Sequence, residues 1–115
     1  MAFSEFELKR IEKAVSLFFE KRLPPGHDRK KLDFGYTISG QSVVLTEIRP
    51  QWDDPSIIHE YPFAKATYVK TQNVWKVFWQ RADLKWHGYK PVSAVASFEE
   101  FLDVVNADKH GCFFG

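Results

Sequence analysis

Short turns between segments of alternating apolar and polar residues constrain the fold of the middle of this chain more than any other feature. Residues 32–38 alternate apolar and polar side chains, which is typical of a half-buried strand. "SGQ" separates them from a second strand-like segment, and "TQN" separates two more at residues 63–70 and 74–81. Connections this short join antiparallel strands, since a parallel crossover needs a dozen or more residues. The sequence therefore predicts an antiparallel sheet.

Two amphipathic helices are predicted, one on each side of the strands. Ser4 and Glu7 have the spacing of a capping box, and so do Ser97 and Glu100. Helical spacing relates the apolar residues that follow each cap, which are Leu8, Ile11, Val15, Phe18 and Phe19 in the first helix and Phe98, Phe101, Leu102 and Val105 in the second. Pro24 and Pro25 end the first helix, and "PPGHDRKK" is predicted to be a loop.

The order of the predicted elements is helix, five strands, helix. The fifth strand is expected at "LKWHGYK", after a turn at Ala82–Asp83. "PQWDDPSIIHEYP" contains three prolines and is predicted to be a loop. This order indicates an α+β fold with an antiparallel sheet of about five strands. A chain of 115 residues fits one domain, so we expect a single α+β domain over residues 1–115.

Composition excludes several classes of protein. The single cysteine, Cys112, rules out an internal disulfide and indicates a reducing compartment. No apolar run reaches the roughly 18–20 residues of a membrane span, and the N-terminal residues lack a signal-peptide pattern, so a cytoplasmic protein without membrane contact is expected. No glycine-rich phosphate loop or four-ligand zinc pattern is present, so we expect no cofactor and no metal.

The stretch "VWKVFWQRADLKWHGY" (Val74–Tyr89) holds three of the four tryptophans. A two-residue turn at Ala82–Asp83 would place Trp79 opposite Trp86. That register predicts that Trp75, Trp79 and Trp86 share the core face of the sheet. A four-residue turn at "KTQN" would place Ala64, Ala66 and Tyr68 beside Trp79, Val77 and Trp75 in the same layer.

The opposite sheet face is predicted to be basic and aromatic. Residues 61–91 carry six lysines and arginines against one aspartate, although the whole chain has a net charge of only +1. The candidate ligand-binding residues are Lys65, Lys76, Phe78, Lys85, His87 and Tyr89, together with Arg81 at the end of its strand.

Such a face has the chemistry of a single-stranded nucleic-acid platform, because rings stack on bases and lysines neutralise phosphates. A non-enzymatic binding module is thus the first functional hypothesis. The structural alternative is an ordinary solvated face, where lysine stems cover apolar surface. A further hypothesis makes the same face a homodimer interface, since exposed aromatic residues often mark protein contacts.

A metal-dependent hydrolase or nuclease is the alternative enzymatic hypothesis. Glu47 falls on the core side of its strand, by alternation with Val43 and Leu45. The residues that could join it are Asp53, Asp54, His59 and Glu60 in the next segment, together with "DLK" at Asp83–Lys85. The structural alternative is an ion pair between Glu47 and either Arg49 or Arg81, because an unpaired buried charge is costly. No catalytic residue is assigned.

Three segments carry a resemblance to a known family. They are "RPQWDDP" (Arg49–Pro55), "VWKVFWQRADLKWHGY" (Val74–Tyr89) and "HGCFFG" (His110–Gly115). With them the chain resembles a family of small bacterial proteins catalogued as a domain of unknown function (family 3024). The resemblance covers nearly the whole chain and implies a bacterial, single-domain protein. It implies no activity, because the family has no assigned catalytic residues to carry over.

Overall fold

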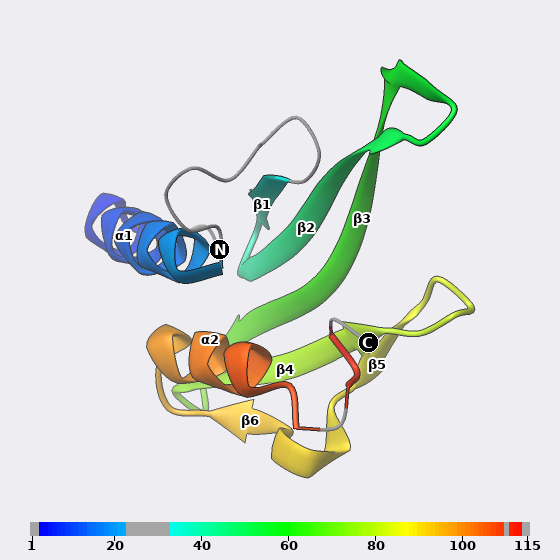
Figure 1. Ribbon diagram of the computed structural model, residues 1–115. Coiled ribbons are helices and arrows are strands. Elements are labelled where there is room, and N and C mark those ends of the chain that lie inside the picture. Colours follow the sequence, from blue (N-terminus) through cyan, green and yellow to red (C-terminus); the bar gives the residue numbers. More distant parts are fainter. Residues whose placement is uncertain (1–2, 23–32, 110, 114–115) are drawn as a thin grey trace.

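The computed structural model describes residues 3–22, 33–109 and 111–113, so the loop predicted for "PPGHDRKK" lies outside the described residues. A helix comes first and last among the described elements, with a sheet between them (Figure 1). The elements are, in chain order, α1 (Glu5–Arg22), β1 (Asp33–Ser39), β2 (Ser42–Gln51), β3 (Asp54–Val69), β4 (Val74–Gln80), β5 (Trp86–Gly88), the 3-10 helix η1 (Lys90–Val92), β6 (Ala94–Val95) and α2 (Phe98–Ala107).

The sheet is antiparallel at every described strand pair. Strands β1 to β4 lie side by side in chain order, and β5 and β6 both pair with the outer edge of β4. Helix η1 separates β5 from β6, and its Pro91 lacks the N–H that a continuing strand would need. The predicted α+β fold with a five-stranded antiparallel sheet is confirmed, and β6 is an extra strand that the sequence did not predict.

Two turns follow their sequence signatures. Gly40 has φ +58° in the two-residue turn between β1 and β2, a conformation that glycine adopts without a steric penalty. The turn between β3 and β4 has the predicted four residues, Lys70–Asn73. It produces the predicted pairs, which are Ala64 with Trp79, Ala66 with Val77 and Tyr68 with Trp75.

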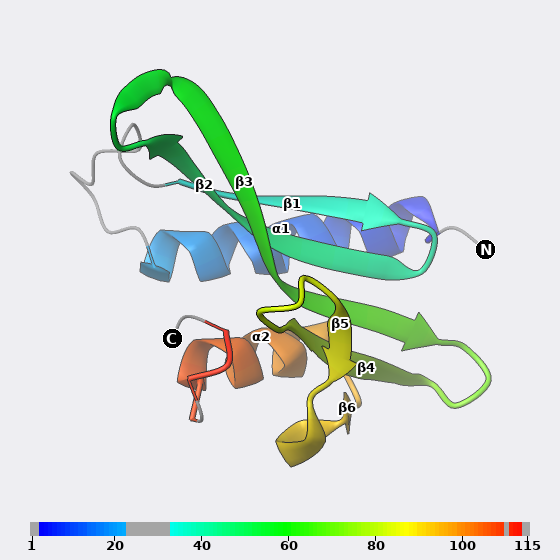
Figure 2. The ribbon, with the colours of Figure 1, turned by 90° about the vertical axis from the view of Figure 1, so that its right-hand side faces the viewer.

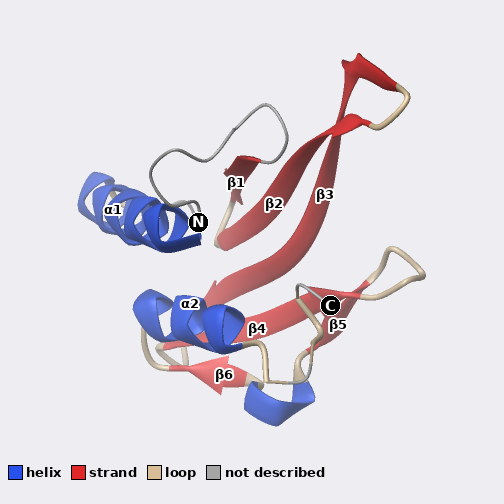
Figure 3. Ribbon diagram, in the orientation of Figure 1, coloured by secondary structure: helices blue, strands red, loops and turns tan. Residues whose placement is uncertain are grey.

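Strands β2 and β3 continue far beyond the other strands as a two-stranded arm, residues 49–62 (Figures 1 and 3). The loop predicted for this stretch from its three prolines was therefore wrong. Pro50, Pro55 and Pro62 are tolerated because each arm strand has an edge without a neighbour among the described strands, where a missing N–H breaks no ladder. The register shifts by one residue at Phe63, and such a bulge bends its strand.

Both helices cover one face of the sheet. Phe19 of α1 stacks on Phe34 of β1 with ring centroids 5.4 Å apart, and Phe98 of α2 meets Trp75 of β4 at 5.1 Å. Figure 2 shows the strands in front of α1 and α2, so the face toward the viewer carries neither helix. The two layers enclose a core whose fully buried members include Val15, Val43, Leu45, Val77, Phe101 and Val105.

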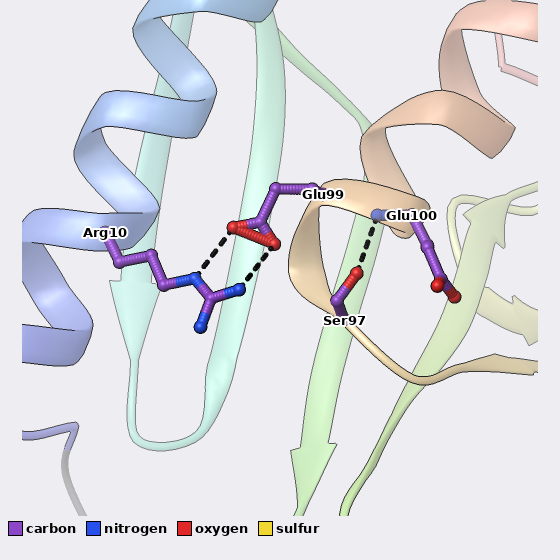
Figure 4. Close-up of polar contacts among 4 residues, drawn as sticks. All are labelled: Arg10, Ser97, Glu99 and Glu100. Atoms are coloured by element: carbon purple, nitrogen blue, oxygen red, sulfur yellow. Dashed lines mark hydrogen bonds and ion pairs between the residues drawn. The ribbon is translucent and has the colours of Figure 1, made fainter.

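The predicted capping box of α1 is complete, and that of α2 is formed in part. In α1, Ser4 and Glu7 exchange hydrogen bonds between their backbone N–H groups and side-chain oxygens, at 3.0 and 3.2 Å. In α2, the Ser97 hydroxyl accepts from the N–H of Glu100 at 3.2 Å (Figure 4). The Glu100 carboxylate accepts from the N–H of Ala96 at 3.1 Å, one residue before the expected donor. Each cap satisfies backbone groups that a helix end leaves without a partner, and this explains why the helices begin where the sequence predicts.

The turn between β4 and β5 differs from the prediction by one residue. Residues 82–84 form it instead of Ala82–Asp83 alone, and Leu84 takes the left-handed conformation at φ +62°. Trp86 therefore pairs with Gln80, and His87 pairs with Trp79. A slip of one residue moves every following side chain to the other face of the sheet. The prediction that Trp86 lies in the core with Trp75 and Trp79 was thus wrong.

Candidate functional site

The sheet face opposite the helices, here called the outer face, carries a compact basic aromatic cluster. Its members are Lys65 of β3, Phe78 of β4 and Trp86 of β5, all half-buried. The Lys65 ammonium lies 4.9 Å from the centroid of the Phe78 ring and 5.2 Å from that of the Trp86 ring. Three neighbouring strands thus bring one cation and two rings into contact. Sequence reasoning did not place Trp86 on this face, because it assumed a turn one residue shorter than the observed one.

The register of β5 separates two further lysines. Lys76 is exposed on β4, opposite Thr67 on the outer face. Lys85 is exposed just before Trp86, so it shares the side of His87, and its predicted position on the outer face was wrong. The backbone N–H of Lys85 donates to Asp83 at 2.9 Å, which holds the start of β5 against its turn. The predicted placement of Lys65, Lys76 and Phe78 on one face agrees with the observed strand pairing.

His87 and Arg81 lie on the other side of the hairpin. His87 Nε2 is 2.9 Å from Asp83 Oδ2, and His87 shares its face with Trp79. The Arg81 guanidinium carbon is 5.5 Å from the centroid of the Trp79 ring. The hydrogen bond from the Lys85 N–H, followed by the one with His87, holds the pKa of Asp83 below its usual range. The predicted position of His87 on the outer face was wrong.

Tyr89 is buried rather than ligand-accessible. Its exposed fraction is 2%, and its ring lies 4.9 Å from that of Phe113. Burial, with the nearby Cys112 and Asp108 groups, raises the pKa of the Tyr89 phenol. The prediction that Tyr89 faces solvent on the mixed face was therefore wrong, for the same reason of register that moved His87.

A pocket of about 410 Å³ adjoins the edge of β5. Its lining combines rings and cations, and consists of Trp79, Arg81, His87, Gly88, Tyr89, Lys90, Pro91 and Cys112. This volume falls in the range of small-molecule sites. The seven candidate residues thus divide between two places. The outer face holds Lys65, Lys76 and Phe78, and the pocket holds Arg81, His87 and Tyr89. Lys85 lies at the hairpin end, on the side of His87.

Glu47, Asp53 and Asp54 each contact a residue two positions away in the sequence rather than one another. Glu47 pairs with Arg49, with Arg49 Nε donating to Glu47 Oε2 at 3.0 Å. Asp53 accepts from the Gln51 amide at 2.6 Å, and Asp54 accepts from the Ser56 hydroxyl at 2.6 Å. Within the described ranges, no group of three or more His, Cys, Asp and Glu side chains is placed to hold a metal ion. The geometry favours the structural ion pair at Glu47 over a hydrolase site.

Cys112 lies half-buried at the rim of the same pocket. Burial, followed by the charge of Asp108, raises the pKa of its thiol. A raised pKa keeps the sulfur protonated at neutral pH, and the thiol is a far weaker nucleophile than the thiolate. Cys112 therefore has the character of a small apolar lining residue.

Taken together, the fold and the cluster define a small α+β protein whose sheet is covered by two helices on one face and is basic and aromatic on the other. Residues 3–115 match the family model described as a domain of unknown function (DUF3024), and the chain belongs to that family. No curated protein and no solved structure matches the chain. Among the described helices, none has the length and apolar character needed to span a membrane.

Proposed function

We propose that this protein binds single-stranded nucleic acid across the outer face of β3, β4 and β5. The observation that carries the proposal is the cluster of Lys65, Phe78 and Trp86 on the sheet face that neither described helix covers. Sheet surfaces that offer rings for stacking and cations for phosphates suit single strands, whose bases are free to splay apart.

The energies of the competing contacts favour a ligand. A cation–π contact at an exposed site contributes about 0.5–1 kcal/mol, whereas a base stacked on an aromatic ring contributes about 1–3 kcal/mol. A base that replaces the Lys65 ammonium over Phe78 or Trp86 therefore gains more than the protein loses. The displaced ammonium then pairs with the phosphate that arrives with the base.

The charge distribution supports the same ligand. Residues 61–91 hold six basic side chains and one carboxylate, Asp83, which already accepts hydrogen bonds from Lys85 and contacts His87. Lys76 is exposed on the same face beside the cluster and suits a phosphate contact. On the far side of the hairpin, Arg81 and Lys90 border the pocket, which could receive the next phosphate group along the strand.

A salt titration tests the proposal. Fluorescence anisotropy of a labelled oligothymidylate of about 16 nucleotides should show binding that weakens steeply with added salt, because released counterions drive phosphate contacts. The Lys76→Ala variant should reduce the salt slope by about one, and Phe78→Ala should weaken binding by about 1–3 kcal/mol with less change in that slope.

Lys13→Ala is the matched control, since Lys13 is an exposed lysine on α1, away from the outer face. Its affinity should equal that of the unaltered chain. Binding that is absent at low salt, insensitive to salt, or weakened equally by Lys13→Ala would eliminate the proposal. The melting curve of Phe78→Ala separates loss of a ligand contact from loss of the fold.

A further inference from the structure

The β2–β3 arm concentrates large apolar side chains in water. Trp52 is 92% exposed, Ile58 56%, Tyr61 50% and Ile57 42%. The arm extends away from both helices, so neither layer of the core covers these residues (Figures 1 and 2). Several large apolar side chains exposed on one short element favour an interaction site, since proteins otherwise bury most such residues.

The same arm presents a strand edge. β3 pairs with β4 only from Ala64 onward, so residues 54–62 have no neighbour on that side among the described strands. Proteins usually protect such edges with lysine, proline or short strands. Pro55 and Pro62 bracket the segment, but the six residues between them, "SIIHEY", contain neither lysine nor proline. This segment is therefore open to pairing with another strand.

We infer that the arm joins two copies of this chain, through antiparallel pairing of the β3 edge with its own counterpart across a two-fold axis. An interface of this kind is self-complementary, because a two-fold axis sets the same edge against itself in the antiparallel direction. Sequence reasoning placed a homodimer interface on the outer face, whereas the arm leaves that face free. The inference therefore stands independently of nucleic-acid binding.

The side chains select one register for the pair. With the axis at Ile58, each Ile58 faces its counterpart, Ser56 faces Glu60, and Ile57 faces His59. Moving the axis to Ile57 would set Asp54 opposite Glu60, and like charges directly opposite destabilise a strand pair. Moving it to His59 would set Glu60 opposite Ile58, a carboxylate against an apolar side chain. The register centred on Ile58 avoids both.

Charge at the tip favours a second copy over an unrelated protein. β4 stops at Gln80 beside the start of the free edge, so an incoming β3 strand continues its line. The acidic tip of one copy, Asp53 and Asp54, then approaches Arg81 at the end of β4 in the other. Contacts between the paired edges partly cover Ile57, Ile58 and Tyr61, an area that suits a modest reversible dimer.

Sedimentation equilibrium of the full chain over a range of concentrations tests the inference. A reversible dimer is expected, and Ile58→Glu should raise its dissociation constant by at least about tenfold, because the axis brings the two new carboxylates together. Leu17→Glu is the matched control, since Leu17 is 51% exposed but lies on α1. It should leave dimerisation unchanged. A chain that stays monomeric at the highest concentration, or equal weakening by both variants, overturns the inference.

Cysteine crosslinking tests the register separately. Directly opposite residues of an antiparallel pair have Cα atoms about 4.5–5.5 Å apart, inside the range that a disulfide spans. In a Cys112→Ser background, Ile58→Cys should crosslink two chains on mild oxidation, and Ile57→Cys should not. Equal crosslinking at both positions overturns this register. Oligonucleotide binding by Ile58→Glu should match that of the unaltered chain, so either proposal can fail without the other.

Discussion

Gly40 and Leu84 share a backbone conformation that costs one of them far more than the other. Their φ angles are +58° and +62°, in the left-handed region where a Cβ meets the following carbonyl oxygen. Gly40 has no Cβ, whereas Leu84 has one and is also 77% exposed, so its side chain recovers little by burial. The extra residue that determines the β4–β5 register is thus held in a strained conformation.

Replacing Leu84 should reveal this strain. Leu84→Gly is expected to be more stable than Leu84→Ala by about 1 kcal/mol. Only glycine relieves the left-handed strain, and this gain exceeds the larger conformational entropy that glycine loses on folding. Urea denaturation of both variants measures the difference, and the alanine variant controls for the lost side chain. Equal stability of the two would show that Leu84 is not strained in solution.

Leu84 also explains the main error in the predicted site. Left-handed residues are usually Gly, Asn or Asp, so a leucine in a turn gives no local signal of a third turn residue. Without this third turn residue, the prediction placed Lys85, His87 and Tyr89 on the outer face, where the structure has Trp86. The β3–β4 register was predictable because Asn73, a residue that tolerates φ +53°, ends its turn. Three of the seven candidate residues, Lys65, Lys76 and Phe78, consequently share the face on which they were predicted.

The helices and the arm differ in how directly residue patterns specify them. α1 and α2 begin at serine caps whose hydrogen bonds involve residues three or four apart, so the local sequence contains the whole signal. The arm has the opposite character. Its three prolines indicate a loop, and only the absence of a neighbouring strand along each edge, a property of the assembled sheet, makes them compatible with β structure.

The cap of α2 can be weighed by substitution. Ser97→Ala should lower the free energy of unfolding by about 1 kcal/mol, since the N–H of Glu100 loses its hydroxyl acceptor. Thermal or chemical denaturation followed by circular dichroism measures the change. Ser16→Ala is the control, because Ser16 is an exposed residue inside α1, where alanine is the better helix former. An equal loss in both variants would contradict a capping role.

At the scale of the whole molecule, polar contacts join elements from distant parts of the sequence. Arg10 of α1 donates from Nε to Glu99 Oε1 at 2.8 Å and from Nη2 to Glu99 Oε2 at 3.3 Å (Figure 4). Arg22 donates to the Asn106 side chain at 3.3 Å farther along the same helices. Because the earlier residue of α1 meets the earlier residue of α2, the two helices run side by side in the same direction.

This link should make stability depend on pH. The hydrogen bonds from Arg10 hold the pKa of Glu99 below its ordinary value of 4.5. A carboxyl whose pKa is lower when folded contributes stability that is fully present above pH 4.5 and is lost as the pH falls through the folded value. Glu99→Gln should therefore flatten the acid side of the stability curve, by a small amount because both partners are partly exposed.

Arg10→Met should flatten the same limb of the curve, and the double variant should add little to either single change. Urea denaturation at several pH values between about 3 and 7 measures these curves, a range that spans the titration of carboxyl groups. Additive effects of the two substitutions would contradict a direct pair between Arg10 and Glu99.

Placing both helices on one face also has a consequence for synthesis on the ribosome. α1 leaves the exit tunnel first, yet α2, which packs beside it, is made after every strand of the sheet. Until α2 is made, the apolar side chains Ile11, Val15 and Phe18 cannot be fully buried. The nascent chain therefore exposes part of this apolar surface to water through most of its translation. The core of this fold can therefore be completed only after α2 has left the ribosome.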